Sequence, residues 1–322
     1  MGLETGARDR ASIVLQQGRA ILVLTSGLAP DSDTSNHIYM HGDGVKEIAF
    51  SVPDARQAFQ AAVRRGAKPV LDPTEYNDGN GIIRKASVAG CGYLVHSFVE
   101  AEQYRGAFLP SYSSLKVVSE KSATGIVAVD HIAFGVERGQ LNDWSDYYEA
   151  VFGFQISHRE DVATGHSSMI SRVLQNGSGT VRFPMMEPAS GARRSQIEEY
   201  LEYNRGSGVQ HIAFLSEDIF KTVRILKTNG VEFLSTPDTY YDMLEKRLGR
   251  VSEDLDRLRE LDILVDRDNC GYLLQIFTKP LQSRPTYFIE IIQRKGAIGF
   301  GGGNIRALFE AVEREQSLRG NL

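Results

Sequence analysis

The chain contains an internal repeat, and this repeat restricts the possible fold more than any other feature. Residues 42–50 match residues 206–214 at an offset of 164, and the match continues downstream without a gap. The aligned pairs downstream are Asp54 with Asp218, Gly66 with Gly230 and Pro73 with Pro237. Each copy predicts a strand, a helix capped by the Asp and ended by the Gly, and a second strand before a Pro turn. Residues 15–18 also match residues 174–177, at an offset of 159, so the sequence predicts two homologous domains.

A shorter repeat lies inside the second domain. Residues 129–134 resemble residues 209–214, which follow 80 positions later. The pattern after them predicts helices over 144–152 and 219–229, and strands over 169–173, 180–183, 231–234 and 272–277. A unit of one strand, one helix and several strands, used twice per domain, predicts an α+β fold. Paired units of this kind are expected to curl their sheets around a shared cleft.

The repeat predicts that the first domain is incomplete. When His131 is moved back by either offset, it falls about 28 to 33 positions before Met1. The N-terminal domain is therefore expected to lack its first strand and first helix. A misplaced start and a genuine loss would each produce this pattern.

Composition changes along the chain indicate the domain limits. Residues 111–125 are rich in Ser and Lys without apolar periodicity, which is typical of a linker. We therefore expect an N-terminal non-catalytic domain over 1–110 and a C-terminal catalytic domain over 126–322. Residues 240–262 look like an insertion that forms one amphipathic helix. Its apolar positions are Leu244, Leu248, Val251, Leu255, Leu258 and Leu261.

Composition and charge exclude several classes of protein. The chain of 322 residues has a net charge of −5 and no basic block, which argues against a nucleic-acid partner. The two cysteines, Cys91 and Cys270, have no CxxC spacing, so disulfides and thiolate metal sites are not expected. Neither a signal peptide nor a membrane span is apparent. These features predict a cytoplasmic protein.

Two histidines and one glutamate stand out as candidate metal ligands. His131 and His211 occupy the same position in two copies of one strand, so their imidazoles converge if the modules face each other. Glu290 lies in the strongly β-forming run 286–292, where a lone carboxylate is costly to bury. Two His and one carboxylate suit non-haem iron(II) with open coordination positions. The alternative is that both histidines pack in the core and Glu290 is a half-exposed strand residue.

The remaining histidines are weaker candidates. Glu47 stands in the N-terminal repeat where His211 stands in the second, so the N-terminal domain is expected to hold no catalytic metal. His37 and His41 are expected in a polar loop, and His96 is expected to be packed in an apolar strand. His158 and His166 flank a charged turn and are expected to be solvated.

At these residues the chain resembles the 4-hydroxyphenylpyruvate dioxygenase family of the vicinal-oxygen-chelate superfamily, which includes 4-hydroxymandelate synthase. The resemblance covers essentially the whole chain and is most specific from residue 129 onward. The segments that carry it are 129–131, 208–213, 266–280, 284–294, 299–304 and 313–322. It implies paired βαβββ modules, iron(II) on His131, His211 and Glu290, and a homo-oligomer. It also implies oxidative decarboxylation and hydroxylation of 4-hydroxyphenylpyruvate to homogentisate with O2, a step of tyrosine catabolism.

The resemblance further implies a substrate-binding set and a helix over 304–316 that closes over the iron. The implied substrate-binding residues are Ser171, Gln196, Gln210, Gln275, Phe277, Phe288, Phe300 and Asn304. Met186 and Ile305 stand where homogentisate-forming members usually carry Asn and Phe, and 4-hydroxymandelate synthases have aliphatic residues at both places. Both enzymes use the same substrate and metal, so 4-hydroxymandelate remains an alternative product. An extradiol catechol dioxygenase, a metal-free binding module and an inactive fragment are further alternatives.

Overall fold

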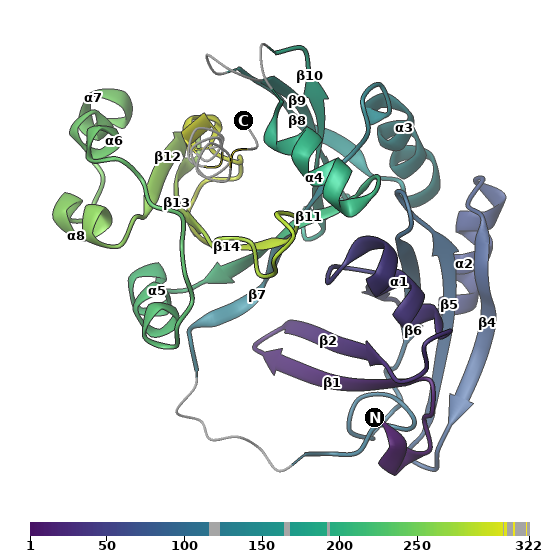
Figure 1. The fold of residues 1–322 in the computed structure, drawn as a ribbon. Coiled ribbons are helices and arrows are strands. Elements are labelled where there is room, and N and C mark those ends of the chain that lie inside the picture. Colours follow the sequence, from purple (N-terminus) through teal and green to yellow (C-terminus); the bar gives the residue numbers. More distant parts are fainter. Residues whose placement is uncertain are drawn as a thin grey trace.

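The computed structural model describes residues 1–115, 123–163, 168–191, 194–304, 306, 307, 312 and 320. Its largest element is an eight-stranded sheet with strand order β12-β13-β14-β11-β7-β10-β9-β8 (Figure 1). The strands are β7 (Ile126–Gly135), β8 (Gln155–Ala163), β9 (Ser168–Gln175), β10 (Arg182–Ala189), β11 (Gly208–Ser216), β12 (Leu264–Asp268), β13 (Gly271–Phe277) and β14 (Phe288–Lys295). Every strand of this sheet comes from the part of the chain after residue 125.

Two modules build this sheet, as the shorter repeat predicts. The first runs β7, α3 (Leu141–Phe152), β8, β9 and β10, and the second runs β11, α5 (Ile219–Thr228), β12, β13 and β14. The strands β7 and β11 pair antiparallel where the modules meet, and each pairs in parallel with the last strand of its own module. Figure 1 shows the sheet curling with α3 and α5 outside it. The α+β fold of paired modules is therefore confirmed.

The N-terminal half repeats the second module. Its four-stranded sheet has the order β3-β6-β5-β4, with the same pairing directions as β11-β14-β13-β12. The strands are β3 (Glu47–Ser51), β4 (Pro69–Asn77), β5 (Ile82–Ala89) and β6 (Val95–Glu100). The matched aspartates cap the matched helices: Asp54 accepts from a backbone N–H at the start of α2 (Ala55–Arg64), as Asp218 does for α5. The long repeat thus corresponds to a repeated structure.

A separate hairpin represents the first module of this half. It consists of β1 (Arg10–Gln17) and β2 (Ala20–Gly27), which pair only with each other, and it is followed by α1 (Asp33–His41). Among the described residues nothing corresponds to β7 or α3, as the repeat predicts. Because no described strand takes the place of β7, one edge of β3 is uncovered. Ala49 on this edge is exposed, whereas its repeat partner Ala213 is fully buried between β7 and β14.

The two halves share a buried core. Ile48, Cys91 and Leu94 from the N-terminal half pack in one cluster with Phe134 and Tyr148 from the C-terminal half. The hydroxyl of Tyr148 lies 2.7 Å from Nε2 of His96, which is itself fully buried on β6. His96 is thus packed, as predicted, and it sits where α3 of one half meets the sheet of the other.

The structure corrects several local predictions. The insertion forms three short helices instead of one: α6 (Asp238–Asp242), α7 (Leu244–Leu248) and α8 (Leu255–Glu260). Gly249 ends α7 with a φ of 71°, and Asp254 caps α8 with two backbone N–H contacts, so the local capping signals interrupt the apolar periodicity.

Two further predictions also differ from the structure. Residues 231–234 form only an isolated bridge, between Phe233 and Thr278, instead of a strand. His37 and His41 lie on the helix α1 instead of in a loop. His166 and residues 116–122 of the predicted linker lie outside the described residues, so the domain limits stay a prediction. Among the described residues no helix is long and apolar enough to cross a bilayer.

Candidate metal centre

Three neighbouring strands bring His131, His211 and Glu290 together. His131 lies on β7, His211 on β11 and Glu290 on β14. In the sheet, Ala213 of β11 is the register partner of both His131 and Glu290. His211 comes two residues before Ala213 and therefore points to the same face of the sheet. The register of the central strands thus sets all three side chains toward one point.

The distances within this cluster allow all three residues to bind one metal ion. Oε2 of Glu290 lies 3.2 Å from Nε2 of His131 and 3.4 Å from Nε2 of His211. One possible ligand atom from each of the three residues lies within 4.8 Å of the others, and all three residues are buried. Two ligands at right angles on bonds of about 2.1 Å stand roughly 3 Å apart. The geometry therefore suits a metal bound on one face, with its other positions free.

Hydrogen bonds orient both imidazoles with Nε2 toward this point. Nδ1 of His131 lies 2.8 Å from Oδ1 of Asp130, and Nδ1 of His211 lies 3.2 Å from Oε1 of Gln210. Both partners are acceptors, so each Nδ1 donates its proton to its partner and leaves Nε2 facing the cluster. This arrangement is typical of metal-ligating histidines.

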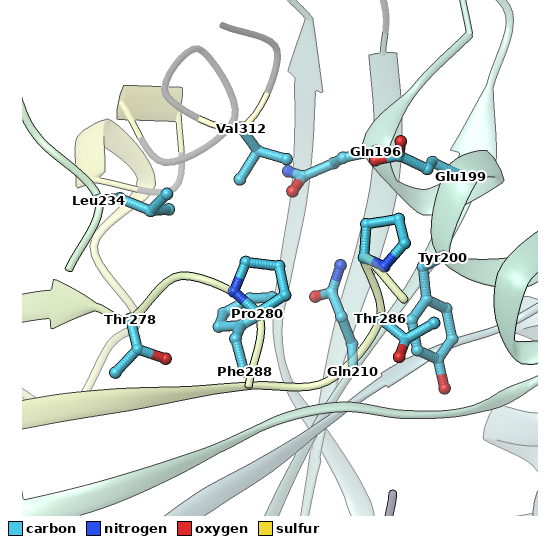
Figure 2. Close-up of a pocket in the computed structure, with 11 residues that line it drawn as sticks. Gln196, Glu199, Tyr200, Gln210, Leu234, Thr278, Pro280, Thr286, Phe288 and Val312 are labelled. Atoms are coloured by element: carbon cyan, nitrogen blue, oxygen red, sulfur yellow. The ribbon is translucent and has the colours of Figure 1, made fainter. Parts of the chain in front are cut away.

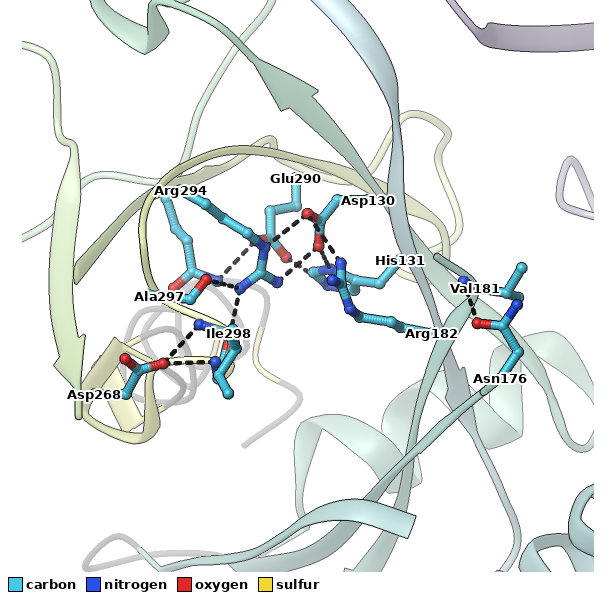
Figure 3. Close-up of polar contacts among 12 residues, drawn as sticks. Asp130, His131, Asn176, Val181, Arg182, Asp268, Glu290, Arg294, Ala297 and Ile298 are labelled. Carbon is cyan, nitrogen blue, oxygen red and sulfur yellow. Dashed lines mark hydrogen bonds and ion pairs between the residues drawn. The ribbon is translucent and has the colours of Figure 1, made fainter. Parts of the chain in front are cut away.

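The carboxylate of Asp130 is itself held by Arg294, as Figure 3 shows. Nε and Nη2 of Arg294 donate to its two oxygens at 2.7 and 2.8 Å. Nη1 of Arg294 donates to the carbonyl oxygens of Ala297 and Gly299, at 3.2 and 2.6 Å. One guanidinium thus connects the orientation of His131 to the loop that precedes residue 300.

The electrostatics of the cluster also favour a cation. Burial alone would lower the pKa of His131, but the carboxylates of Glu290 and Asp130 raise that pKa to about 9. Burial lowers the pKa of His211. Burial would raise the pKa of Glu290, but His131 and His211 outweigh it and lower that pKa to about 2. A positive charge is therefore needed beside Glu290, and a divalent ion can replace the proton on His131.

Aromatic rings enclose the two histidines. The ring of Phe288 stacks on His211 at a centroid distance of 4.8 Å and an interplanar angle of 22°. Phe300 meets His131 edge-to-face at 5.1 Å, and Phe277 meets His211 edge-to-face at 6.4 Å. All three phenylalanines of the predicted set therefore border the cluster, and they exclude water from much of its surface.

A pocket lies beside Phe288 (Figure 2), whose ring stacks on His211. The pocket is partly open to solvent, and its lining combines amide groups with apolar side chains, as small-molecule sites do. The lining residues are Gln196, Glu199, Tyr200, Gln210, Leu234, Thr278, Pro280, Pro285, Thr286, Phe288 and Val312. Figure 2 shows Gln196 and Val312 on the side opposite Phe288 and Gln210. The pocket thus contains Gln196, Gln210 and Phe288 of the predicted substrate-binding set.

The other predicted residues fall into two groups. Gln275 and Asn304 lie behind the cluster, because Nε2 of Gln275 donates to Oε1 of Glu290 at 2.8 Å and Nδ2 of Asn304 donates to Oε1 of Gln275 at 2.9 Å. Ser171 and Met186 are register partners on β9 and β10. The hydroxyl of Ser171 donates to the backbone carbonyl of Glu160 at 3.0 Å.

The predicted closing helix can be followed only in part. Residues 302–304, 306, 307 and 312 have helical backbone. Ile305 and most of the rest of 304–316 lie outside the described residues. Asp266 holds the start of this segment, because its Oδ2 accepts from the backbone N–H groups of Gly303 and Asn304.

Sequence reasoning missed Asp130 and Arg294. Asp130 directly precedes His131, and Arg294 lies four residues after Glu290, on the same face of a strand. A charged residue beside a candidate ligand in an apolar strand was the available signal. Sequence reasoning also did not predict the pocket residues Tyr200 and Thr286, because neither belongs to a recognisable motif.

Comparisons with known proteins show the family of the chain. Residues 128–276 match the model of the Glyoxalase/Bleomycin resistance protein/Dioxygenase superfamily. Proteins named 4-hydroxyphenylpyruvate dioxygenase from Aspergillus fumigatus and Dictyostelium discoideum are each 41% identical to the chain. Both alignments cover 100% of the chain, with 86% and 91% of those relatives. The chain belongs to the 4-hydroxyphenylpyruvate dioxygenase family.

Solved structures place the fold in the same family. A mutant of 4-hydroxymandelate synthase from Streptomyces coelicolor superimposes with a TM-score of 0.87 at 38% identity, covering 98% of this chain and 89% of that one. A fusion of a xylose isomerase-like TIM barrel with 4-hydroxyphenylpyruvate dioxygenase gives a TM-score of 0.74 at 29% identity, covering 96% and 47%. The resemblance to the 4-hydroxyphenylpyruvate dioxygenase family noted in the sequence is therefore confirmed.

Proposed function

We propose that the chain is a 4-hydroxyphenylpyruvate dioxygenase that binds iron(II) through His131, His211 and Glu290. The proposed reaction converts 4-hydroxyphenylpyruvate and O2 into homogentisate and CO2. The observation that carries the proposal is the buried cluster of two imidazoles and one carboxylate, bordered by phenyl rings of which one, Phe288, also lines a pocket. Three protein ligands leave positions for a chelating α-keto acid and for O2.

The metal would supply a site where the keto acid and O2 bind side by side and react. The chain's own residues orient the substrate. Amide groups of Gln196 and Gln210 can bind substrate oxygens without adding a negative charge that competes for the metal. Phe288 offers a ring face beside His211, and Phe300 covers His131, so the reacting atoms are shielded from water. Family membership also supports assembly into a homo-oligomer, which stays a prediction.

A second candidate, 4-hydroxymandelate synthase, differs only in the carbon that is oxidised. The observation that favours it is the apolar environment of Met186, which packs in a cluster with Ala133, Met169 and Ile197. A thioether at this position offers only a weak acceptor for a substrate hydroxyl. The relatives named 4-hydroxyphenylpyruvate dioxygenase and their coverage of the whole chain favour homogentisate.

Product identification tests the proposal. Iron(II)-loaded protein is incubated with 4-hydroxyphenylpyruvate in air, and O2 uptake and the products are measured by an oxygen electrode and by chromatography. We expect one homogentisate per O2 consumed, loss of turnover in His211→Ala, and unchanged turnover in His158→Ala, whose imidazole is exposed on β8. 4-Hydroxymandelate as the sole product would transfer the assignment to the second candidate. A loaded protein that consumes no O2 would contradict both.

A further inference from the structure

A chain of hydrogen bonds runs from the insertion to the carboxylate of the metal cluster. Nη2 of Arg247 donates to the hydroxyl of Tyr240 at 2.8 Å, and this hydroxyl lies 2.7 Å from Oδ1 of Asn304. Nδ2 of Asn304 lies 2.9 Å from Oε1 of Gln275, and Nε2 of Gln275 lies 2.8 Å from Oε1 of Glu290. We call these five residues the relay. It joins α6 and α7, the start of the C-terminal helical segment, β13 and β14.

The chemistry of Glu290 sets the direction of the inner bonds of the relay. An ionised carboxylate only accepts, so Gln275 must turn its NH2 group toward Glu290 and its oxygen toward Asn304. Asn304 then donates to Gln275, because the reverse amide orientation would set two oxygens 2.9 Å apart. In this orientation Oδ1 of Asn304 also lies 2.9 Å from the carbonyl oxygen of Val265, and Nδ2 lies 3.2 Å from the backbone nitrogen of Asp266. The oxygen of Asn304 therefore faces the hydroxyl of Tyr240, which has two acceptors for its proton, Asn304 at 2.7 Å and the carbonyl oxygen of Val265 at 2.8 Å. The amide groups of Asn304 and Gln275 both donate toward Glu290.

At the outer end of the relay, the hydroxyl of Tyr240 has further hydrogen-bond partners. The hydroxyl of Tyr240 accepts from Arg247 and from the backbone N–H of Val265, both at 2.8 Å. Burial is the main cause that raises the pKa of Tyr240 to about 12, so the hydroxyl keeps its proton at neutral pH. The guanidinium of Arg247 also lies over the ring of Tyr240, 4.8 Å from its centroid. The exposed guanidinium of Arg247 thus stabilises Tyr240 at the outer end of the relay.

The relay acts on one oxygen of Glu290 only. Oε1 accepts from Gln275, whereas Oε2 faces both histidines at 3.2 and 3.4 Å. A hydrogen bond to Oε1 favours coordination through Oε2 alone and keeps a further position of the metal free. Gln275, Glu290 and Asn304 are at most 2% exposed, so water does not readily replace a lost partner.

We propose that Tyr240 and Arg247 are positioning residues that act through Asn304 and Gln275 to hold Glu290 as a single-oxygen ligand. This inference rests on the proposed metal site. It assigns a role to the insertion, whose Tyr240 also packs against the cluster of Leu234, Leu264, Phe277 and Phe288. Under this proposal the geometry at the metal also depends on the position of Asn304, at the start of the C-terminal helical segment.

The test compares Tyr240→Phe with Tyr241→Phe in the full chain. Tyr241 is an adjacent buried tyrosine whose hydroxyl takes no part in the relay, so it is a matched control for the loss of one hydroxyl. Co(II) is the probe, because its affinity can be titrated and its visible absorption reports coordination geometry without turnover. Removing a group that orients a metal ligand typically weakens metal binding 10- to 100-fold. Three hydrogen bonds separate Tyr240 from Glu290, so we expect a Kd about 3- to 10-fold higher.

We also expect a changed Co(II) absorption spectrum in Tyr240→Phe, with the spectrum and Kd of Tyr241→Phe equal to those of the starting protein. Arg247→Met tests the exposed end, where a folding defect is not expected, and should shift the Co(II) Kd in the same direction. Arg247→Lys, which keeps a donor, should recover most of the loss. With the iron-loaded enzyme, Tyr240→Phe should lower kcat more than it raises KM.

Unchanged Co(II) affinity and spectrum in both Tyr240→Phe and Arg247→Met would overturn the relay. Equal effects of Tyr240→Phe and Tyr241→Phe would also overturn it, because both would then report packing. Failure of the proposed function looks different: the starting protein would bind Co(II) but produce no homogentisate with iron(II), and the Co(II) comparison would still decide the relay.

Discussion

His96 makes the contact between the two halves sensitive to pH. It is fully buried on β6, with its Nε2 2.7 Å from the hydroxyl of Tyr148 on α3 and its ring packed against Phe152 and Phe183. Burial lowers its pKa from 6.5 to about 3. The folded protein therefore keeps His96 neutral at pH values where the unfolded chain protonates it.

The sign and the size of the effect follow from this difference. Above pH 6.5 neither state binds the proton, and the contribution to stability is complete. As the pH falls from 6.5 toward 3, the unfolded state binds one proton more than the folded state, so the free energy of unfolding decreases. One pH unit corresponds to about 1.4 kcal/mol. At pH 5.0 the loss attributable to His96 is about 2 kcal/mol relative to pH 7.5.

Urea unfolding at pH 7.5 and pH 5.0 measures this loss. In His96→Gln the amide can still reach Tyr148 but cannot be protonated, so its free energy of unfolding should fall by about 2 kcal/mol less than that of the starting protein between the two pH values. His37, whose pKa burial lowers to about 4, contributes equally to both proteins and cancels. His158→Gln removes an exposed histidine and should keep the starting pH dependence. If His96→Gln loses as much stability as the starting protein, the account of this contact is wrong.

Three further predictions concern the metal and the open hairpin. Asp130→Asn presents an NH2 group to Arg294 or to His131 and should weaken Co(II) binding by about 10- to 100-fold in calorimetric titration, whereas an unchanged Kd would show that Asp130 does not orient His131. A metal at 100 times its Kd should raise the free energy of unfolding by about 2.7 kcal/mol, an increase that chelation should abolish, and a chelator without effect on thermal unfolding would contradict the site. Amide protons on the open edges of β2 and β3 should exchange with deuterium faster than those of the paired strands β10 and β11, and equal protection by mass spectrometry would mean that these edges are covered in solution.

Much of the metal site could be predicted from the sequence because its parts are repeated. His131 and His211 stand at equivalent places in two copies of one strand, and a polar pair of this kind in an apolar pattern is recognisable without coordinates. Asp130 and Arg294 were not recognised, because their 164-residue separation gives no local pattern. The same holds for Tyr240 and Glu290, which the relay connects through side chains from four separate elements.

The insertion shows the limit of periodicity. Its apolar spacing predicts one helix, but Gly249 and Asp254 end and restart the helical backbone, and this break positions α6 and α7 beside Asn304. A periodic pattern identifies a buried face, whereas caps and tertiary contacts decide where each helix ends.

The sequence by itself predicted the internal repeat, the paired modules and the two histidines that the structure brings into one cluster. Each of these depends on local pattern or on self-similarity, which are properties of the chain before it folds. Only the tertiary structure decided that Ala213 aligns His131 with Glu290, that Arg294 braces Asp130, and which oxygen of Glu290 faces the histidines. These features depend on strand register and on hydrogen bonds between distant residues, and the packing of the whole sheet fixes both.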